Sequence, residues 1–307
     1  MRPRISAVVV LVVGLFCPGL TAQPPLASNP ERGEPPRLLG VASFYSPRMM
    51  YLKYQPLVDY LSDHSGSQWE LRINTTYQQT VDELCSGRLT AAYMGPLTYV
   101  RAHAACGAEP DLRLRTAGRD TYQSYILVRE DSSIRELADL EGKRFGFGSV
   151  LSTSSHLMPR AMLAEVGIHV PDEIECFYLE HHERAARAVL LGEVDACGIR
   201  DIVGRKFLDR GLRILARSRP IPNFPFVIAP DAPSEVRRGI IRALVELPGE
   251  DPEIAREMAE WDEELAQGFV FSQDAEYDGI RALAEEIIGP GALALPEADL
   301  RCVGPVR

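Results

Sequence analysis

The chain has 307 residues, with 33 Lys and Arg against 43 Asp and Glu, so its formal net charge is −10. It is 46% hydrophobic and 25% charged, proportions that exclude a disordered, collagenous or coiled-coil chain. The acidic balance argues against duplex nucleic acid or an anionic membrane surface as the main partner, because both attract basic proteins. It does not exclude a small anion, and the length allows two lobes with a sizeable core.

The first segment has the features of an export signal. Arg2 and Arg4 supply positive charge, residues 8–16 are apolar but too few to span a bilayer, and a Pro-Gly helix break follows. We therefore predict a signal peptide over residues 1–22 and a secreted, periplasmic protein. An uncleaved anchor and a lipid anchor on Cys17 are the alternatives, but the residue before Cys17 is bulkier than a lipoprotein site needs.

Residues 23–36 are rich in Pro, Ser, Asn and Glu, which predicts a flexible lead-in. After it, short apolar runs alternate with helical patterns, a rhythm typical of parallel α/β architecture. Residues 37–127 are expected to form the first part of a first lobe. Its expected strands are 38–42, 71–73, 90–96 and 124–128, and its expected helices are 54–64 and 80–85.

Residues 128–222 repeat this alternation and are expected to form a second lobe. Ser133 and Glu136 have the spacing of a capping box, which predicts a helix that ends near Gly142. Residues 223–307 are expected to return to the first lobe and to continue into C-terminal helices. The other expected strands are 145–148, 175–179 and 195–199, and the other expected helices begin at 152 or cover 183–191, 253–265 and 275–288.

The cysteines that remain after the predicted signal cleavage are odd in number: Cys85, Cys106, Cys176, Cys197 and Cys302. No pair has the C-x-x-C spacing of a zinc site or a redox dithiol. Pairing is expected in an oxidising compartment, and Cys176 with Cys197 is one candidate because their segments are possible neighbouring strands. At least one cysteine is left without an intramolecular partner.

Ser152, Thr153, Ser154 and Ser155 form the most informative stretch of the chain. These hydroxyls follow an expected strand and precede an expected helix, so that side-chain donors and free helix N–H groups converge. The helix dipole favours negative charge at the same point. The stretch therefore predicts an oxyanion-binding loop, with plain N-capping by one hydroxyl as the simpler alternative.

Four more residues are candidates for contact with such an anion. His182, at the start of an expected helix, can donate to an anion whether neutral or charged, or it is a surface cap. Arg200 follows a strand, and strand ends face the ligand crevice in open α/β sheets; pairing with Asp201 is the alternative. Tyr45 and Tyr122 lie at strand ends or in loops, where packing is the simpler interpretation.

Other chemistry finds less support in the sequence. Ser154, His182 and Asp201 can be written as a nucleophilic triad, but no G-x-S-x-G elbow accompanies them. His181 and His182 are adjacent and point in different directions, which argues against a zinc site with the nearby cysteines. No P-loop or dinucleotide fingerprint occurs, so we expect no cofactor and no metal.

Several short motifs, each weak alone, follow one another in a specific order between about residues 38 and 288. They are Pro56-Leu57-Val58-Asp59-Tyr60-Leu61, Gly95-Pro96-Leu97-Thr98-Tyr99-Val100, Tyr122-Gln123-Ser124-Tyr125, Asp139-Leu140-Glu141-Gly142-Lys143, Ser152-Thr153-Ser154, His182-Glu183, Gly192-Glu193-Val194-Asp195-Ala196 and Pro220-Ile221-Pro222-Asn223. In this order they resemble the periplasmic substrate-binding proteins of phosphate/phosphite/phosphonate ABC transporters.

The resemblance implies a type II periplasmic binding fold, in which a two-stranded hinge joins two α/β lobes and the ligand lies between them. It implies that residues 152–154 hold the oxyanion, that the family histidine is His182 and that the first-loop aromatic is Tyr45. Glu180 stands where the family usually has a small residue, and Met94 stands where some members carry an aromatic. These differences leave the particular oxyanion unnamed.

The implied function is that of a receptor and not of an enzyme. It captures a small oxyanion of the phosphate, phosphite or phosphonate class and delivers it to an ABC permease, as a monomer and without a cofactor. A receptor for a signalling partner such as a sensor kinase is the first alternative, which genomic neighbours would separate from the transporter. A secreted hydrolase that uses Ser154 and His182 is the second.

Overall fold

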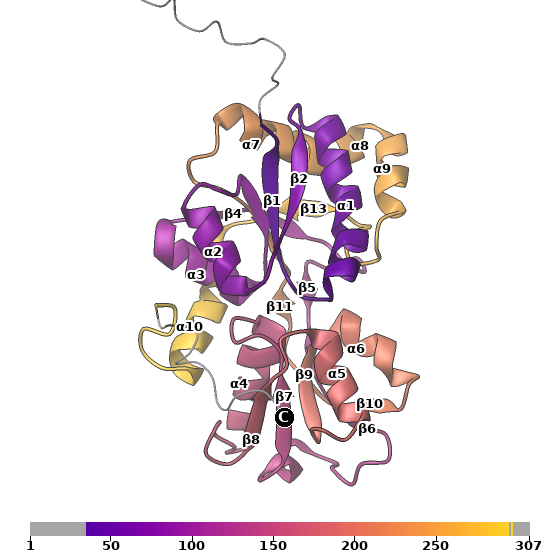
Figure 1. Ribbon diagram of the computed structural model, residues 1–307, viewed down its shortest axis with the longest axis vertical. Helices are drawn as coiled ribbons and strands as arrows, with labels where there is room; N and C mark the ends of the chain where they lie inside the picture. Colours follow the sequence, from indigo (N-terminus) through magenta and orange to yellow (C-terminus); the bar gives the residue numbers. More distant parts are fainter. Residues whose placement is uncertain (1–34, 295, 297–307) are drawn as a thin grey trace, which may run out of the picture. The chain divides into compact units, whose positions relative to one another are not determined.

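Two β-sheets, each covered by helices, are joined by a short two-stranded ribbon in the computed structural model (Figure 1). The structure describes residues 35–294 and residue 296, and the chain from Pro36 onward forms one unit. The predicted signal peptide and nearly all of the predicted lead-in lie outside the described residues. Within the described part of the chain, no helix has the length and apolar character needed to cross a membrane.

The first lobe is built on a six-stranded sheet in the order β13-β4-β12-β3-β1-β2. β1 pairs in parallel with β2 and β3, with α1 and α2 as the crossovers that parallel strands need, whereas β12 runs antiparallel to β3 and β4. The strands are β1 (Arg37–Ala42), β2 (Trp69–Asn74), β3 (Ala91–Tyr93), β4 (Glu109–Leu114), β12 (Pro225–Ile228) and β13 (Phe269–Phe271). The helices are α1 (Pro47–His64), α2 (Tyr77–Cys85), α3 (Pro96–Cys106), α7 (Ser234–Ile241), α8 (Leu247–Glu250) and α9 (Pro252–Ala259).

The second lobe is built on a five-stranded sheet in the order β10-β6-β9-β7-β8. β7 pairs in parallel with β8 and β9, and β6 runs antiparallel to β9 and β10. The strands are β6 (Ser124–Arg129), β7 (Arg144–Phe147), β8 (Glu175–Tyr178), β9 (Ala196–Arg200) and β10 (Leu212–Arg217). The helices are α4 (Met158–Ala164), α5 (His182–Leu190) and α6 (Asp201–Leu208).

The ribbon between the lobes consists of β5 (Thr121–Tyr122) and β11 (Ile221–Pro222), which pair antiparallel. The chain first crosses before Ser124, since β6 belongs entirely to the second sheet, and the expected boundary at residue 127 is therefore a few residues late. The last helix, α10 (Asp278–Ile287), contacts α3 of the first lobe and α4 of the second (Figure 1).

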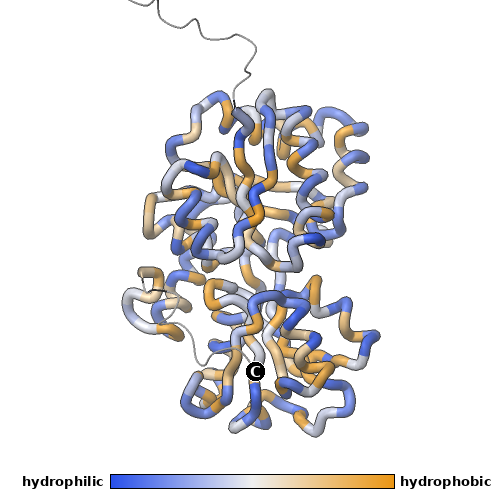
Figure 2. The backbone as a smooth tube through the Cα atoms, viewed as in Figure 1, coloured by the Kyte–Doolittle hydropathy of each residue, from blue (hydrophilic) through white to orange (hydrophobic). Residues whose placement is uncertain are grey.

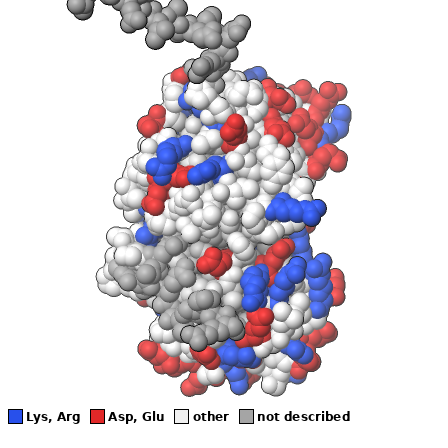
Figure 3. Space-filling model, in the orientation of Figure 1, with Lys and Arg blue, Asp and Glu red and all other residues white. Residues whose placement is uncertain are grey.

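The core of each lobe follows the apolar central strands, which appear as orange segments in Figure 2. Leu39 and Val41 of β1 are fully buried, as are Ile126, Leu127 and Val128 of β6. Strands covered on both faces read as continuous apolar runs, which is why these segments were predictable as strands. Most charged side chains lie at the surface, and acidic side chains gather over α8 and α9 (Figure 3).

Two local predictions need correction. Ser133 does not open a helix: the helical turn covers Leu137–Leu140, and its capping box joins Glu136 to Asp139. The Asp139 carboxylate accepts the N–H groups of residues 135 and 136 at 2.6 and 3.1 Å, and an ionised acceptor is stronger than a hydroxyl. The helix expected over 253–265 ends at Ala259, and the chain beyond it turns toward the ribbon between the lobes.

The predicted pairing of Cys176 with Cys197 is wrong. Cys197 is a buried free thiol, and β7 lies between the strands that carry the two cysteines, so they are two strands apart and beyond disulfide reach. A disulfide joins Cys85 to Cys106 instead, with their Cα atoms 5.6 Å apart. It ties the end of α2 to the end of α3, away from the ends of these helices that face the second lobe.

Candidate functional site

The predicted anion loop is a buried helix start. Ser152 is the N-cap, and its hydroxyl accepts the N–H of Ser155 at 3.2 Å. Residues 153–157 form a wide helical turn that runs directly into α4, where Pro159 sits in the first turn. The four hydroxyl residues are each at most 4% exposed. The stretch is therefore both an N-cap and a concentration of hydroxyl groups inside the protein.

Close packing holds this loop against the strand that precedes it. A Cβ atom on Gly148 would lie 2.2 Å from Oγ of Ser155, so only glycine allows the approach. A Cβ atom on Gly146 would lie 2.7 Å from the side chain of Leu179. Gly146 and Gly148 thus allow the close packing of the loop and of Leu179 against this strand.

Both lobes bring side chains to the loop from the carboxyl ends of parallel strands, which is where ligands bind in open α/β sheets. In the first lobe, Tyr45, Tyr77 and Leu97 follow β1, β2 and β3. In the second lobe, the loop follows β7, His182 follows β8 and Arg200 ends β9. Tyr122 lies in the ribbon.

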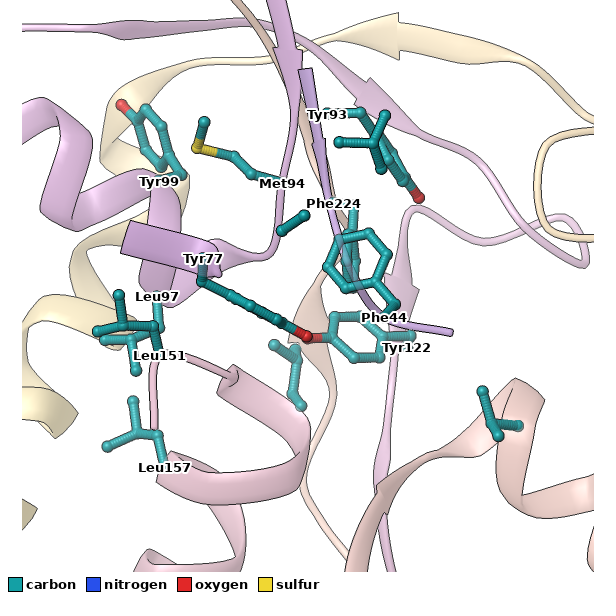
Figure 4. Packing of buried hydrophobic residues seen from close by; sticks show 14 of the residues in the cluster. Phe44, Tyr77, Tyr93, Met94, Leu97, Tyr99, Tyr122, Leu151, Leu157 and Phe224 are labelled. Carbon is teal, nitrogen blue, oxygen red and sulfur yellow. The ribbon is translucent and has the colours of Figure 1, made fainter. Parts of the chain in front are cut away.

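Several buried donors around the loop form no hydrogen bond of acceptable geometry. They are the hydroxyls of Tyr77, Tyr122 and Ser155 and the Nε of Arg200. The two tyrosine side chains point toward one another (Figure 4), with the Tyr77 hydroxyl near Ser152 and the Tyr122 hydroxyl near residues 153 and 154. Burial raises the pKa of both tyrosines, which keeps them neutral O–H donors. An unsatisfied buried polar group costs about 1–3 kcal/mol, so this cluster is suited to acceptors from a ligand.

Two hydrogen bonds between the lobes lie beside the anion loop. The Thr153 hydroxyl accepts the backbone N–H of Leu97 at 2.8 Å, and the Thr98 hydroxyl donates to the Leu151 carbonyl at 3.2 Å. Leu97 lies in the first turn of α3, whose N-cap is Gly95 and has no side-chain cap. A second helix N-terminus therefore points at the anion loop.

His182 is buried and neutral. Its Nδ1 accepts the backbone N–H of Arg200 at 3.2 Å, which leaves the ring proton on Nε2. Burial, and next the charge of Arg200, lower the pKa of His182 to about 3. The alternative of a surface cap is wrong, since the residue is 1% exposed. His182 can thus supply one uncharged N–H donor.

Arg200 has a partner that the sequence did not indicate. Its Nη1 lies 2.5 Å from Oε1 of Glu264, and its Nη2 donates to Oδ1 of Asn223 at 3.3 Å. The guanidinium also stacks 3.9 Å over the ring of Phe224. Pairing with Asp201 does not occur, because that carboxylate bonds the N–H of the next residue and Arg205 within its own helix.

Glu264 is the centre of a buried cluster in the first lobe. Its carboxylate accepts the hydroxyls of Tyr45 and Tyr54 at 3.3 Å each and of Tyr93 at 2.8 Å. The structure therefore places Tyr45 against Glu264, with its hydroxyl engaged there. Sequence reasoning missed Glu264, Tyr54, Tyr77 and Tyr93; only Tyr77 carries a usable signal, its place just after the end of β2.

The residues proposed for a nucleophilic triad or a zinc site do not form such a site in the structure. His182 accepts from a backbone N–H and not from Ser154, and Asp201 is engaged within α6, so the triad has no orienting carboxylate. Among the described residues, one group has the arrangement of possible metal ligands, His103, Glu109 and Asp274. It includes no cysteine, and Arg281 forms an ion pair with Asp274.

The two departures from the family pattern have different consequences. Glu180 is exposed and has a φ of 65°, in the left-handed region that favours glycine over a residue with a long side chain. Met94 is fully buried beside the aromatic cluster of Phe44, Tyr93 and Phe224 (Figure 4).

Comparisons with known proteins agree with this geometry. The family model of the periplasmic substrate-binding protein of phosphonate ABC transporters matches residues 39–277. The chain is 27% identical over 255 residues to the phosphate-import protein PhnD of Mycolicibacterium smegmatis, which covers 76% of this chain and 79% of that protein.

Solved structures share the fold. The binding-protein component of an ABC phosphonate transporter from Pseudomonas aeruginosa aligns with a TM-score of 0.71 at 20% identity, over 81% of this chain and 85% of that chain. PhnD1 from Prochlorococcus marinus, in complex with methylphosphonate, aligns with a TM-score of 0.72 at 16% identity, over 81% and 97%. The predicted fold of two α/β lobes on a two-stranded connection is confirmed.

Proposed function

Since this chain belongs to the family of periplasmic substrate-binding proteins of phosphonate ABC transporters, we propose that it captures a small phosphorus oxyanion between its lobes and delivers it to an ABC permease. The family is a transporter component and not a group of enzymes, which confirms the expectation of a binding protein and sets the hydrolase aside. Its location is extracytoplasmic. Residues 1–22 are proposed to be the export signal that takes it there.

One observation carries the proposal, namely the buried donors around the anion loop. The hydroxyls of Tyr77, Tyr122 and Ser155 are buried at a helix start, and none of them forms a hydrogen bond of acceptable geometry. A tetrahedral oxyanion offers several acceptor oxygens at once, and it is favoured at the N-terminus of a helix. The name of the relative from M. smegmatis and the methylphosphonate in the Prochlorococcus protein support a phosphorus centre.

The donors come from both lobes, which links binding to closure. Tyr77 belongs to the first lobe, the anion loop to the second, and Tyr122 to the ribbon between them. A ligand that contacts all three stabilises the closed arrangement over an open one. The permease then recognises the closed, ligand-bound form of the protein.

Calorimetric titration with phosphate, phosphite, methylphosphonate and sulfate tests the binding step. We expect Tyr77→Phe and Tyr122→Phe each to weaken binding of the best phosphorus ligand by about tenfold, the equivalent of one hydrogen bond. Tyr60→Phe is the matched control, because that buried hydroxyl donates to the Ala243 carbonyl at 2.6 Å, away from the loop. Absence of binding by every phosphorus oxyanion would contradict the proposal.

Delivery is tested with a phosphonate ABC permease from the same organism, reconstituted in lipid nanodiscs. The loaded protein should stimulate its ATPase activity more than the unloaded protein does. Stimulation of a sensor kinase in place of the permease would assign the receptor to signalling.

A further inference from the structure

Resting on the proposed function, we propose that Glu264 determines which charge state of the oxyanion the protein binds. The carboxylate neutralises Arg200 inside the closed cleft, so that a ligand with one negative charge is taken in preference to the same ligand with two. Glu264 belongs to the first lobe and Arg200 to the second, and the two side chains are 1% and 4% exposed.

The first step is that Glu264 is held as an ion. Three tyrosine hydroxyls and the Arg200 guanidinium converge on its two oxygens. Burial opposes ionisation, but Arg200 and then Lys53 outweigh it and hold the pKa of Glu264 below its usual range. The carboxylate of Glu264 therefore stays ionised in the folded protein.

The second step is the charge balance. Arg200 is cancelled by Glu264, Lys53 is paired with Asp262 at 2.5 Å, and His182 is neutral. The donors aimed at the ligand are hydroxyls and N–H groups, which stabilise a first negative charge through fixed dipoles. Among the described residues, the two cations that are at most 4% exposed, Lys53 and Arg200, are thus both paired with carboxylates, so no fully buried cation is left over for a second charge.

The third step is that the field of Glu264 reaches the anion loop. The guanidinium of Arg200, 2.5 Å from the Glu264 carboxylate, lies 5.0 Å from the centre of the Tyr122 ring, and the backbone N–H of Arg200 donates to His182. Both charges act on the groups beside the loop: Arg200 lowers the pKa values of Tyr77 and His182, and Glu264 opposes that effect at each. Unit charges several ångströms apart still interact appreciably at an effective dielectric constant of about 20. A second negative charge on the ligand is therefore opposed by Glu264.

Few other groups complicate a pH experiment. Tyr45, Tyr54 and Tyr93 face Glu264, and burial raises their pKa values well above the ordinary value, so they stay neutral. Burial lowers the pKa of Arg200, but its neighbours, the Glu264 carboxylate first among them, outweigh burial and raise this pKa well above the ordinary value, so Arg200 keeps its charge across neutral pH. His181, whose Nδ1 lies 3.1 Å from the Ser43 carbonyl, is removed from the profile by a His181→Gln background.

The test measures the dissociation constant of methylphosphonate by calorimetry from about pH 5.5 to about pH 8.5, which spans its change from monoanion to dianion. In the wild type, affinity should fall as the dianion replaces the monoanion. In Glu264→Gln, Arg200 is released, and the affinity ratio of dianion to monoanion should rise about tenfold or more.

Two matched variants control for charge and for structure. Glu264→Asp keeps the carboxylate and should keep the wild-type profile even if overall affinity drops. Glu263→Gln removes the same formal charge from the neighbouring residue, which is 59% exposed and pairs with Lys206 of the second lobe at 3.2 Å. Its profile should match the wild type, because exposed charges are screened.

An unchanged profile in Glu264→Gln would overturn the inference. Should that variant not fold, Arg200→Met leaves Glu264 uncompensated and must steepen the fall, while Arg200→Met with Glu264→Gln removes both charges and must restore the wild-type shape. A flat profile in Arg200→Met would equally overturn it. Failure of the wild type to bind methylphosphonate or phosphate in either charge state would instead be a failure of the proposed function.

Discussion

The hydroxyl of Thr153 and the backbone N–H of Leu97 form a 2.8 Å hydrogen bond that joins the anion loop of one lobe to the first turn of α3 in the other. The bond brings two helix N-termini together, and both favour negative charge. We expect a bound oxyanion to replace this internal acceptor with one of its own oxygens.

Thr153→Ala should weaken oxyanion binding by about 1–3 kcal/mol, because one donor to the ligand is lost. Thr153 is 2% exposed, so the variant should also lose some stability, about 1 kcal/mol, through the unpartnered N–H of Leu97. Calorimetry and urea unfolding measure the two effects. Thr153→Ser is the control that keeps the hydroxyl, and unchanged affinity in Thr153→Ala would remove the loop from the site.

Ligand binding should close the two lobes. The contacts that cross between them, such as Thr98 with Leu151 and His181 with Ser43, are available only in a closed form. Small-angle scattering should therefore give a smaller radius of gyration at saturating ligand than without ligand. Identical scattering curves with proven binding would mean that the cleft is closed before the ligand arrives.

His182 should act as a neutral donor. With a pKa of about 3, it carries no charge near neutral pH, so affinity for hypophosphite, a monoanion throughout, should not fall between about pH 5 and 8. His182→Gln should keep part of the binding because glutamine also offers an N–H. A steep loss of wild-type affinity with rising pH, absent in His182→Gln, would show that the cation is what binds.

Acid should destabilise the protein through its buried histidines. His156 and His182 have pKa values lowered to about 3, whereas an unfolded chain binds protons on both near the ordinary value of 6.5. The unfolded state thus holds more protons than the folded state below about pH 6.5. The free energy of unfolding therefore falls by up to about 1.4 kcal/mol per pH unit for each of the two histidines as the pH decreases. Urea unfolding between about pH 6.5 and 4.5 measures this slope, and His182→Gln should halve it.

Local patterns sufficed for much of the architecture. The apolar runs of β1 and β6 and the hydroxyl stretch at residues 152–155 are contiguous, so their structure depends on neighbours in the chain. Arg200 became a candidate because it follows an expected strand, and the direction of a parallel strand fixes which of its ends faces a ligand crevice. His182 became one because it begins an expected helix, which likewise depends only on neighbours in the chain.

The features that the sequence did not predict depend on contacts between residues far apart in the chain. Glu264 lies beyond the end of α9, in a stretch whose charge pattern predicts more helix. Its burial requires Arg200, which is 64 residues away, and three tyrosines that are more than 170 residues away. The pairing of Cys85 depends likewise on how α2 and α3 pack. No local pattern distinguishes a buried glutamate from an exposed one.

The most direct test of the central claim is a crystal structure of the protein grown with methylphosphonate. The account predicts the phosphonate oxygens within hydrogen-bonding distance of the hydroxyls of residues 152–155, Tyr77 and Tyr122, with Nε2 of His182 as a further donor. A ligand bound elsewhere, for instance in the 430 Å³ cavity lined by Arg160 and Arg219, with the anion loop unliganded, would contradict it.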